Sequence, residues 1–121
     1  MSTIALTEDT FESTITDNDI VFIDWWASWC GPCRMFAPVF EDAAAKHDDI
    51  VFAKVDTEAE QRLAGLAEIR SIPTLMAFRE GVLVFSQPGA LPAHMLEDLI
   101  GKVRELDMAD VHAAVAARAA G

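Results

Sequence analysis

The chain has 121 residues, of which 52% are hydrophobic, a size and composition suited to one domain with a single buried core. Its 20 Asp and Glu outweigh 9 Lys and Arg, for a formal net charge of -11, which argues against a nucleic-acid partner because such proteins need clustered positive charge. Residues 1–9 contain neither a basic start nor a long apolar run, so no secretory signal or membrane anchor is readable, and we expect a cytoplasmic protein without a membrane partner.

The first half of the chain predicts a helix, a buried strand and a second helix, in that order. Thr7 followed by two acidic residues is typical of a helix N-terminus. The run from 20 to 27 is almost continuously apolar and rich in β-branched and aromatic side chains, which predicts a central strand buried on both faces. Apolar residues at helical spacing predict a helix over 33–46, which Pro38 would kink.

The second half continues this alternation and ends in a hairpin and a helix. Because strands alternate with helices as far as residue 79, we expect the first three strands to pair in parallel. Glu80-Gly81 forms a two-residue turn, which adds antiparallel pairing. The pattern predicts a strand over 50–56, a helical crossover over 58–67, strands over 74–79 and 82–85, and a helix from 92 to about 106. The sequence therefore predicts an α/β fold, with a central mixed β-sheet flanked by α-helices.

The two cysteines, Cys30 and Cys33, are separated by Gly31 and Pro32. A disulfide between cysteines so close together cannot cross-link distant parts of a small secreted fold, and such a pair is more typical of metal binding or catalysis. They lie between a predicted strand and a predicted helix, where open α/β sheets place their active sites. A cysteine on the first helical turn faces unpaired N–H groups that favour the thiolate, so we expect Cys30 to be the nucleophile. Cys33 is near enough to attack the resulting mixed disulfide as the resolving thiol.

A zinc site is the alternative interpretation of this C-x-x-C spacing. It would need further ligands, but His47, His94 and His112 are widely spaced and the chain has no second C-x-x-C. We therefore expect no metal. The chain also has no G-x-G-x-x-G turn, so we expect no bound cofactor and assign NADPH and flavin chemistry to a separate reductase.

Residues 24–33, Asp-Trp-Trp-Ala-Ser-Trp-Cys-Gly-Pro-Cys, resemble the active-site segment of the thioredoxin family, and Ile72-Pro73-Thr74 resembles the substrate-groove loop of that family. The resemblance covers residues 3–106. It implies the thioredoxin fold, reduction of protein disulfides in client proteins, recycling by a thioredoxin reductase, and a monomer. We therefore divide the chain into a thioredoxin domain over 1–107 and an Ala-rich C-terminal extension over 108–121, which is either a frayed tail or a docked helix.

The Gly-Pro pair between the cysteines is the pair that thioredoxins carry, and it implies a strongly reducing couple. Disulfide-introducing relatives usually carry a His there. The Gly-Pro pair and the missing signal peptide therefore favour a reductant over an oxidase or isomerase. A thioredoxin-fold subunit that binds a partner without turnover is the other competing function. The intact cysteine pair argues against it.

Asp24 interrupts the apolar strand, where an unpaired carboxylate is costly, so we expect its pKa to be raised if it is buried. The alternative is an outward-facing Asp at a strand end. The resemblance implies that Asp24 assists proton transfer at Cys33 and that Lys54 lies near it, although an ordinary solvated lysine is equally compatible with the sequence.

The resemblance also implies that Pro73 is cis and faces the cysteines, and that the backbone before Pro73 pairs with substrate. The implied substrate-binding residues are Trp29, Gly31, Pro32, Ile72, Pro73, Gly89 and Ala90.

Overall fold

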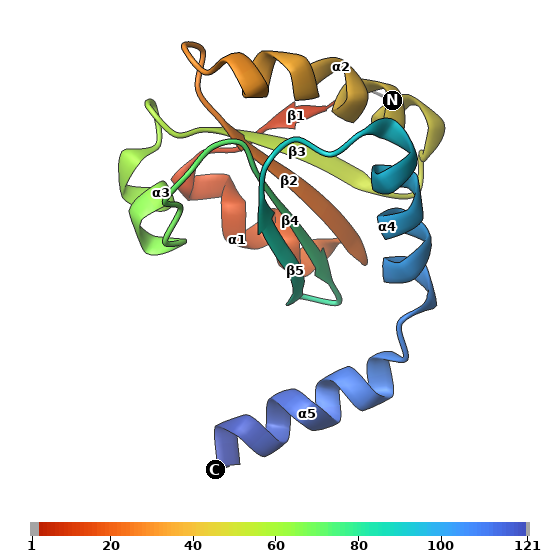
Figure 1. Ribbon diagram of the computed structural model, residues 1–121. Helices are drawn as coiled ribbons and strands as arrows, with labels where there is room; N and C mark the ends of the chain where they lie inside the picture. The colour runs from red at the N-terminus through yellow and green to blue at the C-terminus, as the bar shows by residue number, and fades with distance from the viewer. Residues whose placement is uncertain (1–2, 121) are drawn as a thin grey trace.

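The computed structural model describes residues 3–120, which form a five-stranded mixed sheet between two layers of helices (Figure 1). The sheet order is β1-β3-β2-β4-β5, with β2 in the middle, as the apolar run over 20–27 predicts. The elements are β1 (Ile4–Ala5), α1 (Glu8–Asp17), β2 (Ile20–Trp26), α2 (Gly31–Lys46), β3 (Val51–Asp56), α3 (Gln61–Leu66), β4 (Thr74–Arg79), β5 (Val82–Pro88), α4 (Ala93–Glu105) and α5 (Met108–Ala120). The predicted fold class is confirmed.

Alternate side chains of β2 enter two separate cores, one on each face of the sheet. Phe22 belongs to the core that also contains Phe36 and Phe40 of α2 and residues of α4. Trp25 contacts Phe11 of α1 and belongs to the core that also contains residues of α3. The first six residues of β2 are all buried. Because Asp24 lies two positions beyond Phe22, its side chain belongs to the face that α2 covers.

The pairing of β4 corrects one expectation drawn from the sequence. β2 and β3 are parallel as predicted, but β4 runs antiparallel to β2. The reason is the length of α3, whose six residues span only about 9 Å, whereas a return along a six-residue strand needs about 20 Å. The chain therefore enters β4 near the end of the sheet where β3 finishes, and β4 runs back in the opposite direction.

Strand β1 is absent from the sequence prediction, because two residues are too few to show a periodicity. It exists through its parallel pairing with β3, in which Ile4 lies opposite Ala53. The predicted hairpin at Glu80-Gly81 is present, and both residues have positive φ, 51° and 79°, as a tight two-residue turn requires.

The end of α4 is held by a side chain from β4. Arg79 Nη1 donates to the carbonyl oxygens of Val103, Arg104 and Leu106 at 2.9, 2.9 and 3.0 Å. These carbonyls lie at the end of the helix, where backbone donors are scarce, and that of Val103 also accepts a hydrogen bond from the N–H of Leu106 at 3.4 Å. Arg79 therefore fixes α4 against the sheet.

The C-terminal extension forms helix α5 as far as residue 120. Met108, at its start, is buried, and His112 Nε2 lies 2.8 Å from Glu80 Oε1, while the rest of the helix is mostly exposed. It lies apart from the helical layers that cover the sheet (Figure 1). Within residues 3–120, no helix combines the length and apolar character needed to cross a membrane.

Candidate redox site

The first turn of α2 carries both cysteines. Cys30 is the N-cap residue, and its Sγ accepts a hydrogen bond from the backbone N–H of Cys33 at 3.2 Å. Pro32 fits in this turn because its missing N–H would have no partner inside the helix. The turn contains no acidic residue, so the positive end of the helix dipole acts on Cys30 Sγ without competition from a carboxylate in that turn.

Cys30 and Cys33 are joined by a disulfide, with their Cα atoms 5.2 Å apart. The side chain of Cys33 lies on the same buried face of α2 as Phe36 and Phe40, so it points toward the sheet. These are the only two cysteines of the chain. The pair can therefore exist as a disulfide or as a dithiol, a difference of two electrons and two protons.

A second loop lies against Cys30. The carbonyl oxygen of Ile72 is 3.6 Å from Cys30 Sγ, and the Ile72–Pro73 peptide bond is cis, as the resemblance implies. The carbonyl oxygen of Pro73 accepts a hydrogen bond from the N–H of Gly89 at 2.8 Å. The structure thus brings together Cys30, Ile72, Pro73 and Gly89 from three separate segments.

The other predicted groove residues lie next to these in the chain. Trp29 precedes Cys30 and is 65% exposed, and Ala90 follows Gly89 and is also exposed. Gly31 and Pro32 form the start of α2. An exposed indole beside a redox-active sulfur offers apolar contact area to a client, and the contribution of each of these residues to binding stays a prediction.

Asp24 is fully buried, so the outward-facing alternative is wrong. Burial raises its pKa from 3.8 to about 7; Lys54 lowers it, and Glu41 raises it further. Among the described residues, neither carboxylate oxygen has a hydrogen-bond partner. Asp24 can therefore exchange a proton near neutral pH, as a general acid or base requires.

Lys54 is the Cα partner of Asp24 on β3, and its side chain is only 19% exposed, so it is not an ordinary solvated lysine. Its ammonium lies 5.1 Å from the centre of the Trp26 ring and 4.0 Å from Glu41 Oε2. The sequence gives no signal for Glu41, because a single glutamate on a helix is indistinguishable from other surface carboxylates. Only the packing of α2 on β3 reveals it.

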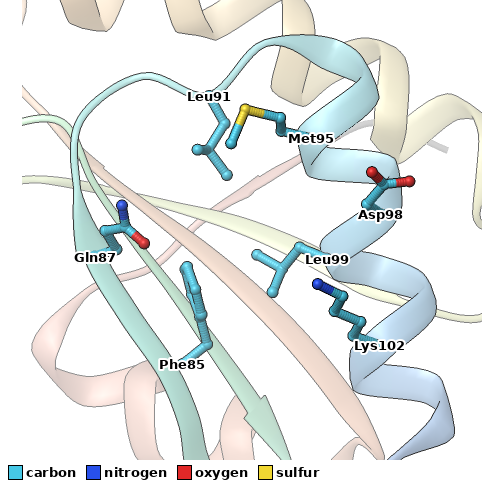
Figure 2. A pocket seen from close by; sticks show the side chains of 7 residues that line it. All are labelled: Phe85, Gln87, Leu91, Met95, Asp98, Leu99 and Lys102. Atoms are coloured by element: carbon cyan, nitrogen blue, oxygen red, sulfur yellow. The ribbon is translucent and has the colours of Figure 1, made fainter.

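No group of three or more potential metal ligands lies together within residues 3–120. His47 instead bonds Glu97, with Nε2 2.7 Å from Oε1, and His112 bonds Glu80. A shallow pocket between β5 and α4 contains none of the predicted site residues (Figure 2). It is lined by Phe85, Gln87, Leu91, Met95, Asp98, Leu99 and Lys102.

Comparison with known proteins agrees with this geometry. The thioredoxin family model matches residues 2–102. The chain is 57% identical over 115 residues to a Streptomyces coelicolor protein with the provisional name thioredoxin 2, covering 95% of this chain and 86% of that protein. It is 42% identical over 100 residues to thioredoxin 1 of Synechococcus elongatus, covering 81% of this chain and 94% of that protein.

A solved structure of a thioredoxin variant from Halobacterium salinarum NRC-1 superposes with a TM-score of 0.79 at 36% identity, covering 86% of this chain and 91% of that chain. A family match over most of the chain, close relatives and a disulfide-bonded pair at 30 and 33 lead to the same assignment. The chain is a protein-disulfide reductase, a thiol–disulfide oxidoreductase working through Cys30 and Cys33, and it belongs to the thioredoxin family.

Proposed function

We propose that the chain reduces client disulfides in two exchange steps, with Cys30 attacking and Cys33 resolving. The Cys30 thiolate attacks one client sulfur, forming a mixed disulfide and releasing the other client sulfur as a thiolate. Cys33 then loses its proton and attacks Cys30 Sγ, which releases the second client thiolate and forms the Cys30–Cys33 disulfide. The pair gives up two electrons and the client disulfide gains them. The observation that carries this order is the position of Cys30 Sγ at the N-cap of α2, where it accepts the Cys33 N–H.

The loop beside Cys30 supports a way of holding the client. The Ile72 carbonyl lies 3.6 Å from Cys30 Sγ, so an extended client segment that bonds this backbone brings its own disulfide to the attacking sulfur. Asp24 accepts the Cys33 proton in the second step, directly or through water, because its pKa of about 7 matches that task.

A thioredoxin reductase recycles the oxidised pair, and the clients are proteins with accessible disulfides. The family assignment supports both partners. A strongly reducing dithiol works where the thiol pool is reduced, which supports the cytoplasm as its location. We further propose a monomer in which residues 1–107 form the redox unit and 108–121 an appendage. The family match over 2–102 and the separate position of α5 support that division (Figure 1).

Insulin reduction with dithiothreitol as electron donor tests this function. The wild-type protein should accelerate precipitation of the insulin B chain, and Cys30→Ser should not. A binding subunit without turnover would leave the precipitation rate at the level of dithiothreitol alone, and that result would overturn the proposal.

A further inference from the structure

Three segments that are distant in the chain meet at one carboxylate outside the cysteine pair. Thr3, just before β1, donates its hydroxyl to Glu41 Oε2 at 2.8 Å. The same oxygen of Glu41, on α2, lies 4.0 Å from Lys54 Nζ on β3. The side chain of Glu41 is 42% exposed, so this carboxylate contacts solvent on one side and the lysine on the other.

Lys54 is held away from the carboxylate that stands opposite it. Lys54 and Asp24 are Cα partners on adjacent parallel strands and lie on the same face of the sheet. Among the described residues, however, Lys54 is paired with Glu41 and placed over Trp26, while both oxygens of Asp24 lack a hydrogen-bond partner. The carboxylates of Asp24 and Glu41 therefore compete for the Lys54 ammonium, and the more exposed one, Glu41, has the contact.

We propose that Glu41 is a positioning residue for proton transfer in this redox site: anchored by Thr3, it retains the Lys54 ammonium on the solvent side, away from the buried Asp24 carboxylate. The inference deepens the proposed function, since it rests on Asp24 as the proton acceptor for Cys33. Glu41 acts on Asp24 through Lys54, in addition to the direct effect of its own negative charge.

The charged groups that face Asp24 are few. Lys54 comes from β3 and Glu41 from α2, and the β4 partner of Asp24 is the uncharged Leu75. The cysteines of α2 do not titrate while they form the disulfide. The α4 residues in the core on this face of the sheet are apolar. A change in the titration of Asp24 can therefore be traced to Lys54 and Glu41.

Glu41→Gln should make Asp24 a stronger acid for two reasons. The substitution removes a negative charge that opposes ionisation of Asp24, and it releases Lys54 to approach the buried carboxylate. We expect the titration midpoint of Asp24 to fall by about one pH unit, a roughly tenfold change in its ionisation equilibrium.

The experiment is a pH titration of the Asp24 side-chain carboxyl carbon by NMR in the oxidised protein, with no client present. Asp42→Asn is the matched control, because it removes one carboxylate from the adjacent, exposed position of α2 and should leave the midpoint nearly unchanged. Thr3→Val should shift the midpoint in the same direction as Glu41→Gln but less, and Thr3→Ser, which keeps the hydroxyl, should restore it.

A double-mutant cycle with Lys54→Met separates positioning from simple charge. In the Lys54→Met background, Glu41→Gln should lower the midpoint by less than half as much as in the wild type, because the part transmitted by the lysine is gone. Equal shifts in both backgrounds, or equal shifts for Glu41→Gln and Asp42→Asn, would overturn the proposal. A failure of the proposed function would appear elsewhere, as insulin reduction by Asp24→Asn at the wild-type rate.

Discussion

Asp24 and Lys54 face each other across β2 and β3, yet among the described residues the lysine makes its ion pair with Glu41. The buried carboxylate is left with no hydrogen-bond partner in residues 3–120. Ionisation of Asp24 therefore lowers the free energy of unfolding, and this effect can be measured.

Asp24→Asn should stabilise the protein at alkaline pH. The pKa of Asp24 is raised from 3.8 to about 7 in the folded state, so the folded protein holds this proton when the unfolded chain has lost it. The stability linked to the proton is fully present below pH 3.8, is lost between pH 3.8 and about 7, and stays lost above that window. The advantage of Asp24→Asn should grow by about 2 to 3 kcal/mol between pH 5 and pH 8.

Urea unfolding of both proteins at the two pH values measures this difference, and taking the difference cancels any constant effect of the asparagine side chain. Asp42→Asn, at an exposed position, serves as the control and should show no such growth. An Asp24→Asn advantage that is the same at pH 5 and pH 8 would contradict a raised pKa.

Cys33→Ser should accumulate a mixed disulfide with insulin, whereas Cys30→Ser should form none. Each cysteine performs one of two exchange steps, so loss of the second step leaves the first adduct in place. Non-reducing gels and intact-mass measurement detect the adduct, and dithiothreitol should release it. Adduct formation by Cys30→Ser instead would reverse the two roles.

Arg79→Met should destabilise the protein by about 2 to 4 kcal/mol, because three carbonyl oxygens at the end of α4 lose a charged donor. Arg62→Met is the matched control. The side chain of Arg62 is 77% exposed and pairs with Glu8 at 3.0 Å, so its loss should change the stability by less than about 1 kcal/mol. Equal urea midpoints for the two variants would show that Arg79 does not hold α4.

A chain ending at residue 107 should reduce insulin as fast as the full chain. Its stability should fall by about 1 to 2 kcal/mol, because the buried side chain of Met108 is removed. Insulin reduction and urea unfolding of the shortened protein check the two parts. Loss of reduction in a protein that remains folded would place α5 within the redox unit.

The sequence predicts the features that depend on local pattern. The apolar run of β2, the cysteine at the start of α2 and the Glu80-Gly81 turn each follow from residues close together in the chain. The direction of β4 is not predicted, because it depends on how far α3 carries the chain back along the sheet.

The candidate site divides in the same way. Cys30, Cys33 and the buried Asp24 are identifiable from their neighbours in the sequence, since each is unusual for its position. Glu41 is not, because its importance comes from contacts with Thr3 and Lys54, which lie on other segments. A contact between ordinary residues leaves no trace in the sequence of either one.

The two edges of the sheet limit pairing with strands of another molecule. β1 offers only two residues for pairing with another molecule, and β5, at the opposite edge, ends in Pro88, which has no backbone N–H to donate. At the start of β5, Val82, Leu83 and Val84 share a groove with α5, whose presence there restricts access by another strand. The sheet is therefore poorly suited to template the growth of intermolecular β-structure, even though its central strand is one of the most apolar segments of the chain.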